Sequence, residues 1–125
     1  MILERMPWDL SVCRGAALPP VDLLQGPFFV ARTDVEVSLV CLTSSVPSGM
    51  PLREDGWKAF RVRGVLDFSQ IGILAGIARI LAENGIGILA LSTYDTDYIL
   101  VKAEALDHAL TALSEAGYEV VLSGV

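Results

Sequence analysis

The sequence has few of the residues on which catalysis and metal binding usually depend. It contains one histidine, His108, and two cysteines, Cys13 and Cys41, in 125 residues. A catalytic triad or a set of zinc ligands cannot be assembled from one imidazole and two thiols in separate apolar runs. No glycine-rich phosphate loop follows a predicted strand. The sequence therefore predicts a protein that is not an enzyme and has no metal or cofactor.

Positive charge and long apolar runs are also scarce. The chain has 9 Lys and Arg against 15 Asp and Glu, a net charge of −6, and its basic residues are scattered. Nucleic-acid binding needs clustered basic residues, so we expect no nucleic-acid partner. No apolar run approaches the roughly 20 residues that cross a bilayer, and residues 1–6 lack the apolar core of a signal peptide. We therefore expect a cytoplasmic protein with no membrane partner, whose two cysteines act as small hydrophobic residues.

What the chain does contain is a hydrophobic fraction of 53%, enough for a packed core. Its central stretch predicts a helix from Ile71 that is buried on more than one side and ends at Asn84-Gly85. Two strands follow, over 86–93 and 97–103, and a tight turn joins them. The apolar residues at helical spacing are Ile71, Leu74, Ala75, Ala78, Leu81 and Ala82, widened by Ile73, Ile77 and Ile80.

Similar elements flank this stretch. A strand over 58–65 precedes the helix, a one-sided helix begins near Leu106 and stops at Gly117, and a strand over 118–122 follows. The order βαββαβ predicts an α+β fold of the ferredoxin-like type, a four-stranded antiparallel sheet with both helices on one face.

The first part of the chain favours strands. Alternating or β-rich runs over 8–13, 28–33 and 35–42 predict a mainly β region with one short helical turn over 21–25. The long polar segment over 43–56 is rich in Pro, Gly and Ser, and we place the domain boundary at its end. The expected division is therefore 1–56 and 57–125.

Two motifs resemble the ACT domain. Gly-Ile-Leu-Ala-x-Ile-Ala-x-x-Leu-Ala-x-x-Gly-Ile starts at Gly72, and Ser-Thr-Tyr-Asp-Thr-Asp-Tyr-Ile-Leu-Val starts at Ser92. They resemble small bacterial ACT proteins related to aspartate-kinase regulatory regions and to the cytosolic arginine sensors of animals. The resemblance implies an ACT domain over 57–125 and, before it, a truncated, mainly β ACT-like half in tandem.

The resemblance also implies a function. Such domains are regulatory and non-catalytic, commonly bind a small amino acid or related carboxylate at paired ACT units, and commonly form homodimers. A helix N-terminus offers unpaired N–H groups to a carboxylate, Asp67 could accept an ammonium group and Asp97 a second cationic group. The expected ligand-binding residues are Asp67, Phe68, Ser69, Gln70, Ile71, Gly72, Ile73, Leu74, Thr93, Tyr94 and Asp97.

Structural roles remain open for several of these residues. Asp67 is equally suited to capping the helix and Asp97 to bonding amides in the turn, while Gly72 and Gly76 are suited to close packing of the helix on the sheet. The alternative function is a structural dimerisation or interaction domain without a small ligand. A small hydrolase on the same fold ranks below both, because no catalytic asparagine stands near the strand arginines.

Overall fold

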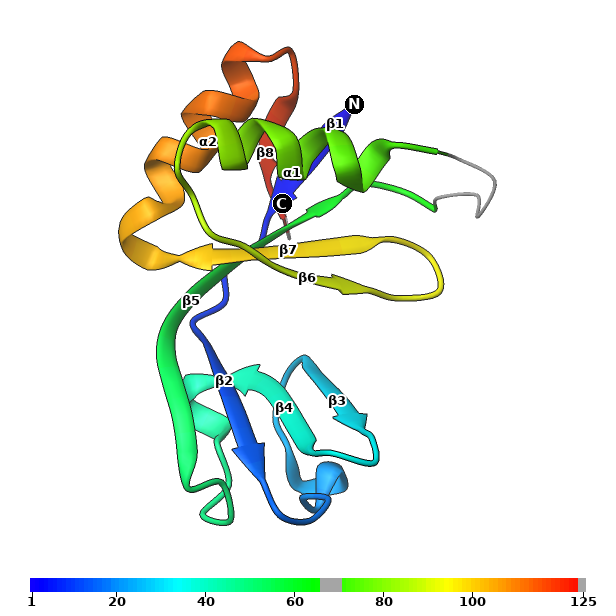
Figure 1. Cartoon of the computed structure of the whole chain (residues 1–125), viewed down its shortest axis with the longest axis vertical. Coiled ribbons are helices and arrows are strands. Elements are labelled where there is room, and N and C mark those ends of the chain that lie inside the picture. The colour runs from blue at the N-terminus through cyan, green and yellow to red at the C-terminus, as the bar shows by residue number, and fades with distance from the viewer. Residues whose placement is uncertain (66–70, 124–125) are drawn as a thin grey trace. The chain divides into compact units, whose positions relative to one another are not determined.

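The computed structural model describes residues 1–65 and 71–123 (Figure 1). The chain forms two compact units, and we call Met1–Pro7 with Lys58–Val125 unit 1 and Trp8–Trp57 unit 2. In sequence, unit 2 is therefore inserted after the first strand of unit 1. Strand β5 spans Leu52–Val62, so its first part lies in unit 2 and its second in unit 1.

Unit 1 is a sheet with two helices on one face (Figure 1). The order of strands is β6-β7-β5-β1-β8, in which β1 runs antiparallel to β5 and parallel to β8. This arrangement confirms the predicted ferredoxin-like α+β fold and adds β1 between its first and last strands. The elements, besides β5, are β1 Ile2–Arg5, α1 Ile73–Glu83, β6 Leu89–Ser92, β7 Asp97–Lys102, η3 Ala103–Ala105, α2 Leu106–Glu115 and β8 Glu119–Leu122.

The core of unit 1 lies between the sheet and its helices. Phe60 from β5, Ile77 from α1 and Leu113 from α2 are all fully buried in it. The large residues of α1 face this core, whereas Ala75 and Ala82 are exposed. The prediction that α1 is buried on more than one side is therefore wrong for these positions, because bulky side chains gain more from burial than alanines at the same spacing.

Glycines set both ends of α1. Gly85 has φ +72° just after the C-cap, as predicted, and the equivalent prediction for Gly117 after α2 is confirmed by φ +102°. At the other end the N-cap is Gly72, with φ +83° and no side-chain cap. The helix therefore starts at Ile73 rather than at Ile71, and the predicted caps lie outside the described residues.

Unit 2 repeats the element order of unit 1 with 3₁₀ turns in place of α-helices. Its antiparallel sheet has the order β3-β4-β2-β5. A small core of Cys13, Leu39, Cys41 and Met50 lies on one face, and both cysteines are free. The truncated, mainly β half is thus present. Its elements, besides β5, are β2 Leu10–Gly15, η1 Val21–Leu23, β3 Phe28–Arg32, β4 Val37–Leu42 and η2 Thr43–Ser45.

The two units also share a hairpin turn. The N–H of Thr33 donates to the carbonyl of Glu36, and that of Thr93 donates to the carbonyl of Thr96, both at 2.9 Å. The strand pairs that these turns close, Arg32 with Val37 and Ser92 with Asp97, have the same spacing. A 3₁₀ turn follows the second strand in each case. The sequence therefore folds as a tandem of one motif.

Two strands depart most from the expected ones, while β6 begins at Leu89 rather than at Ile86 and β2 covers Leu10–Gly15 rather than 8–13. Strand β1 was not expected within residues 1–6, and the structure pairs it with β5 and β8. Strand β5 begins at Leu52, inside the polar segment expected to be a loop. The first seven residues thus lie in unit 1 rather than with the N-terminal half, while the expected domain division at residue 56 stays a prediction.

Candidate functional site

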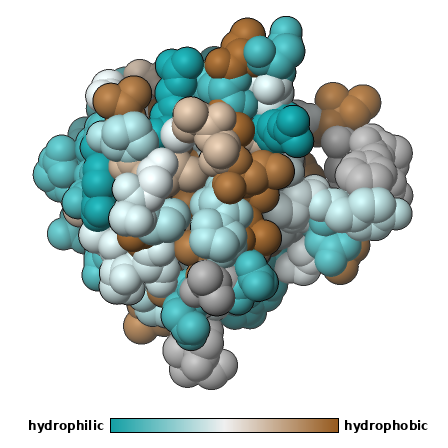
Figure 2. All heavy atoms as spheres, turned by 90° about the horizontal axis from the view of Figure 1, so that it is seen from below, coloured by the Kyte–Doolittle hydropathy of each residue, from teal (hydrophilic) through white to brown (hydrophobic). Residues whose placement is uncertain are grey.

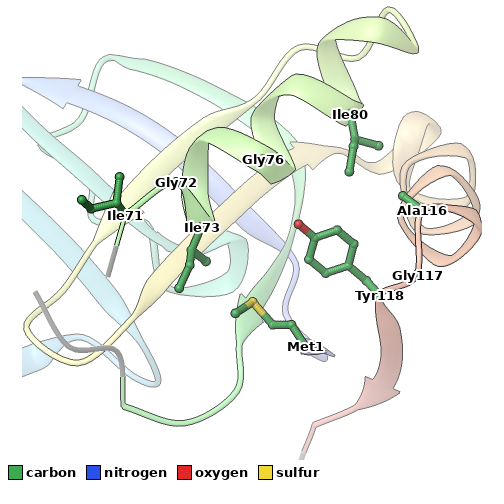
Figure 3. Close-up of a pocket in the computed structure, with 9 residues that line it drawn as sticks. All are labelled: Met1, Ile71, Gly72, Ile73, Gly76, Ile80, Ala116, Gly117 and Tyr118. Carbon is green, nitrogen blue, oxygen red and sulfur yellow. The ribbon is translucent and has the colours of Figure 1, made fainter. Parts of the chain in front are cut away.

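A groove of about 440 Å³ runs along α1 of unit 1 (Figure 3). Three elements form it: the start of α1, the first residue of the chain and the connection from α2 into β8. The N–H of Glu119 donates to the carbonyl of Met1 at 3.1 Å, so the pairing of β1 with β8 holds Met1 at the groove. The lining residues are Met1, Ile71, Gly72, Ile73, Gly76, Ile80, Ala116, Gly117 and Tyr118.

This groove is apolar apart from backbone groups and one phenol. Figure 3 shows Tyr118 extending from the start of β8 toward α1 with its hydroxyl foremost. A Cβ placed on Gly76 would lie 3.4 Å from that hydroxyl oxygen, an ordinary contact. Tyr118 therefore lies against the helix at Gly76 with space for a methyl group between them, and the phenol is the one side-chain hydroxyl among the lining residues.

The first N–H groups of α1 lie at the helix end that borders this groove. The first α-helical hydrogen bond of α1 runs from the N–H of Gly76 to the carbonyl of Gly72 at 2.8 Å. The N–H groups of Ile73, Leu74 and Ala75 precede that bond, and among the described residues no side chain caps the helix. Such groups carry the positive end of the helix dipole and favour an anion.

Gly72 has a conformational reason to be glycine. Its φ of +83° is a region that side chains disfavour, and a Cβ built there would meet no atom of the described residues within 4 Å. The alternative that Gly72 marks close packing of the helix on the sheet is therefore not supported. The open space in front of it is what a ligand that approaches the backbone would need.

The β6–β7 hairpin carries the other group of expected site residues. The hydroxyl of Thr93 donates to the carbonyl of Thr96 at 3.1 Å, and Tyr94 is 80% exposed. Asp97 accepts a hydrogen bond of 2.6 Å from the hydroxyl of Ser92 on the facing strand. The carboxylate of Asp97 thus stabilises the hairpin by bonding the hydroxyl of Ser92, and not by bonding the amides of the turn as expected.

The structure divides the expected residues into sets. Ile71, Gly72 and Ile73 line the groove, while Leu74 packs against the core. Thr93, Tyr94 and Asp97 do not line it, although their turn and the start of α1 lie at the same end of unit 1 (Figure 1). The others, Asp67, Phe68, Ser69 and Gln70, lie outside the described residues.

A charged cluster occupies the sheet face opposite the helices. Arg61 donates to Glu4 at 3.2 Å and to the hydroxyl of Tyr98 at 3.1 Å, and Arg63 lies 3.8 Å from Glu4. Burial alone would lower the pKa of Arg61, but the hydrogen bonds with Tyr98 and Glu4 outweigh it and raise the pKa. This cluster is thus an ion-pair network, in which Arg61 stays charged.

Other chemistry has little support. Among residues 1–65 and 71–123, no three His, Cys, Asp or Glu side chains are placed to hold a metal ion. In the same residues, no helix is long and apolar enough to span a membrane. Burial raises the pKa of both thiols, that of Cys41 to about 11, so neither cysteine is an activated nucleophile.

Comparison with known proteins decides the family. The sequence model of the ACT domain matches residues 52–115 of the 125. The chain belongs to the ACT-domain family. A search of proteins with curated functions gave no match.

Solved structures support this ACT assignment. A structural-genomics protein from Agobacterium tumefaciens is 30% identical, with a TM-score of 0.86 over 99% of this chain and 94% of its own. A Vibrio cholerae protein described as a possible transport protein is 25% identical, with a TM-score of 0.73 over 89% and 85%. The ligand-free regulatory subunit of aspartate kinase from Thermus thermophilus is 11% identical, with a TM-score of 0.65 over 92% and 96%, and shares the fold.

The sequence offered only part of this site. The helix start and the hairpin could be located because their motifs are local. Met1 and Tyr118 could not, because the parallel pairing of β1 with β8 brings them to the groove. The only sequence signal for these two groove residues is that each is an apolar residue directly before a strand, Met1 before β1 and Tyr118 before β8.

Proposed function

We propose that this ACT protein is a non-catalytic regulatory protein that binds a small amino acid or a related carboxylate at the start of α1. The bound molecule would act through paired ACT units. The fold that the chain shares with the regulatory subunit of aspartate kinase is consistent with such a role. The location of the site depends on the ligand-binding residues expected from the sequence.

The observation that carries the proposal is the start of α1, where no described side chain caps the helix, beside a groove. The N–H groups of Ile73, Leu74 and Ala75 suit a carboxylate, and Gly72 has no side chain in front of them. The neighbouring groove supplies apolar walls for the rest of the ligand. Asp97, which does not line this groove, would be supplied from nearby or from the paired half and would accept a cationic group, in exchange for or in addition to its bond from Ser92.

We further propose a homodimer. The strand order of unit 1 ends at β6 on one side and β8 on the other, and β3 ends the sheet of unit 2. Unpaired strand edges are commonly covered by a second subunit. On the face seen in Figure 2, brown apolar side chains form small groups among teal polar ones, which favours pairing at an edge over burial of that face. Light scattering at high micromolar concentration should give twice the chain mass.

Calorimetric titration with each of the twenty amino acids tests ligand binding. At least one should bind saturably, and Gly72→Asn should weaken that binding about tenfold or more, because asparagine tolerates positive φ but places a side chain before the amides. Gly85→Asn is a matched control at the other end of α1, with φ +72° and similar open space. If both variants bind like the parent, the ligand does not lie at Gly72.

The alternative, a structural interaction domain, makes the opposite prediction. It expects the same dimer, and none of the twenty amino acids should bind or raise the melting temperature. A dimer without any ligand would therefore favour the alternative.

A further inference from the structure

Unit 2 contains a hollow of about 410 Å³ within its own residues. The end of β2, the β3–β4 turn and the start of β5 surround it, and all three lie at the lower end of this unit in Figure 1. Its volume falls in the range of small-molecule sites, roughly 300–1,000 Å³. The residues that decide its chemistry are Arg14, Gly15, Arg32, Thr33, Asp34 and Glu36.

The hairpin repeat relates this hollow to the expected site of unit 1. Because the two turns share their register, Thr33, Asp34 and Val37 occupy the places that Thr93, Tyr94 and Asp97 occupy in unit 1. Those three residues of unit 2 all line the hollow. The hollow is thus the counterpart, in unit 2, of the hairpin part of the expected site.

The hollow of unit 2 is lined by charged side chains, whereas the groove along α1 of unit 1 is not. A guanidinium nitrogen of Arg14 donates to the carbonyl of Val35 at 3.5 Å, so Arg14 lies against the turn. Glu36 accepts a hydrogen bond from Ser38. Within the described part of the chain, Arg32 and Asp34 form no ion pair. Two cationic and two anionic groups therefore line one small space.

Such a balanced set of charges favours one class of ligand. Two arginines can bind a carboxylate through charge-assisted hydrogen bonds, and two carboxylates can accept an ammonium group. A dianion such as inorganic phosphate would be repelled by Asp34 and Glu36, and a simple cation by Arg14 and Arg32. We propose that unit 2 binds a zwitterionic amino acid in this hollow, as a second site beside that of unit 1.

Nuclear magnetic resonance of the full-length, ¹⁵N-labelled protein tests the second site directly. Titration with each of the twenty amino acids should shift the amide signals of Gly15, Thr33 and Asp34 saturably for at least one of them. The double variant Arg14→Gln/Arg32→Gln should weaken this response about tenfold or more, because it removes both carboxylate partners. Signals of α1 should respond as in the parent, which separates this proposal from the site of unit 1.

The control variant is Arg79→Gln, which removes one exposed positive charge on α1 and should leave the response of unit 2 unchanged. Acetate and methylammonium, each carrying one half of the zwitterion, should shift the same signals far less than the amino acid. The proposal is overturned if no amino acid shifts these signals saturably, if the double variant responds like the parent, if Arg79→Gln abolishes the response, or if acetate alone reproduces it.

Discussion

Apart from the additional strand β1 in unit 1, the two units have the same order of strands and connections, but they differ in what covers their sheets. Unit 1 places two α-helices of 11 and 10 residues on one face, whereas the corresponding segments of unit 2 are 3₁₀ turns of 3 residues each. A short turn cannot bury a broad apolar stripe. The core of unit 2 is accordingly small and contains two cysteines and a methionine, while that of unit 1 contains large aliphatic residues and Phe60.

The difference teaches which parts of the motif are needed for the sheet and which for the proposed ligand. The strand order and the hairpin turn persist without α-helices. Among the described residues, only unit 1 has an α-helix start, whose N–H groups no described side chain caps. We therefore expect the two proposed sites to use different groups for a carboxylate: helix amides in unit 1 and arginines in unit 2.

The largest expected effect comes from truncating matched core residues in the two units. Ile99→Ala in unit 1 should lower the free energy of unfolding by about 3–5 kcal/mol, because the fully buried side chain leaves a cavity in the core between the sheet and its helices. Leu39→Ala in unit 2, also fully buried, should cost nearer to about 2 kcal/mol, because 3₁₀ turns can close over a cavity more easily than helices. Urea unfolding measures both, and equal costs would contradict the comparison.

A smaller effect is expected at the glycine that ends β2. A Cβ on Gly15 would lie 2.7 Å from the sulfur of Met50 and 3.1 Å from the carbonyl oxygen of Gly49. Gly15→Ala should therefore destabilise the protein by about 1–3 kcal/mol through overpacking. Gly49→Ala, where a Cβ meets nothing within 4 Å, is the control and should change stability by less than about 0.5 kcal/mol. Thermal melting of both variants checks the difference.

The thiols, which lie only in unit 2, predict that stability depends on pH. Burial raises the pKa of Cys41 to about 11 from an ordinary 9.0, so the folded state holds the proton more tightly than the unfolded state. The stability from this group is complete below pH 9 and is lost as the pH rises toward 11. Cys41→Val, which installs the residue found at the equivalent position 101, should flatten the decline of melting temperature in that range. If Cys41→Val loses melting temperature between pH 9 and 11 as the parent does, the raised pKa of Cys41 is contradicted.

The smallest effect on stability is expected at the exposed hairpin of unit 1. Asp97→Ala removes one hydrogen bond, from Ser92, and should cost about 0.5–1.5 kcal/mol. Its effect on ligand affinity should be larger, about 1.5–3 kcal/mol, if the carboxylate binds a cationic group of the ligand. Ser92→Ala removes the same intramolecular bond but keeps the carboxylate. Calorimetry should therefore show weak binding for Asp97→Ala and parent-like binding for Ser92→Ala.

Much of the fold could be predicted from the sequence because its signals are local. Gly85 and Gly117 end their helices where φ is positive, and no other residue adopts that conformation as readily. By contrast, β1 has only 4 residues and is defined by distant partners. The first part of β5 is exposed and polar, so its strand pairing left no hydrophobic pattern.

The site was predictable to the same extent. The motifs located the helix start and the hairpin, but the stripe of α1 was assigned partly to alanines that are exposed. Because apolar residues occur all around this helix, their spacing could not show which positions are the most buried. The charged hollow of unit 2 was not expected either, because Arg14 and Asp34 are brought together only when β2 and the hairpin pair.

The central claim, a carboxylate on the first turn of α1, can be tested by amide hydrogen exchange. The protein would be measured alone and with the amino acid that binds most tightly in calorimetry. We predict that exchange of the N–H groups of Ile73, Leu74 and Ala75 slows on binding, while that of the last turn of α1 does not change. Binding without any added protection of these three amides would contradict the claim.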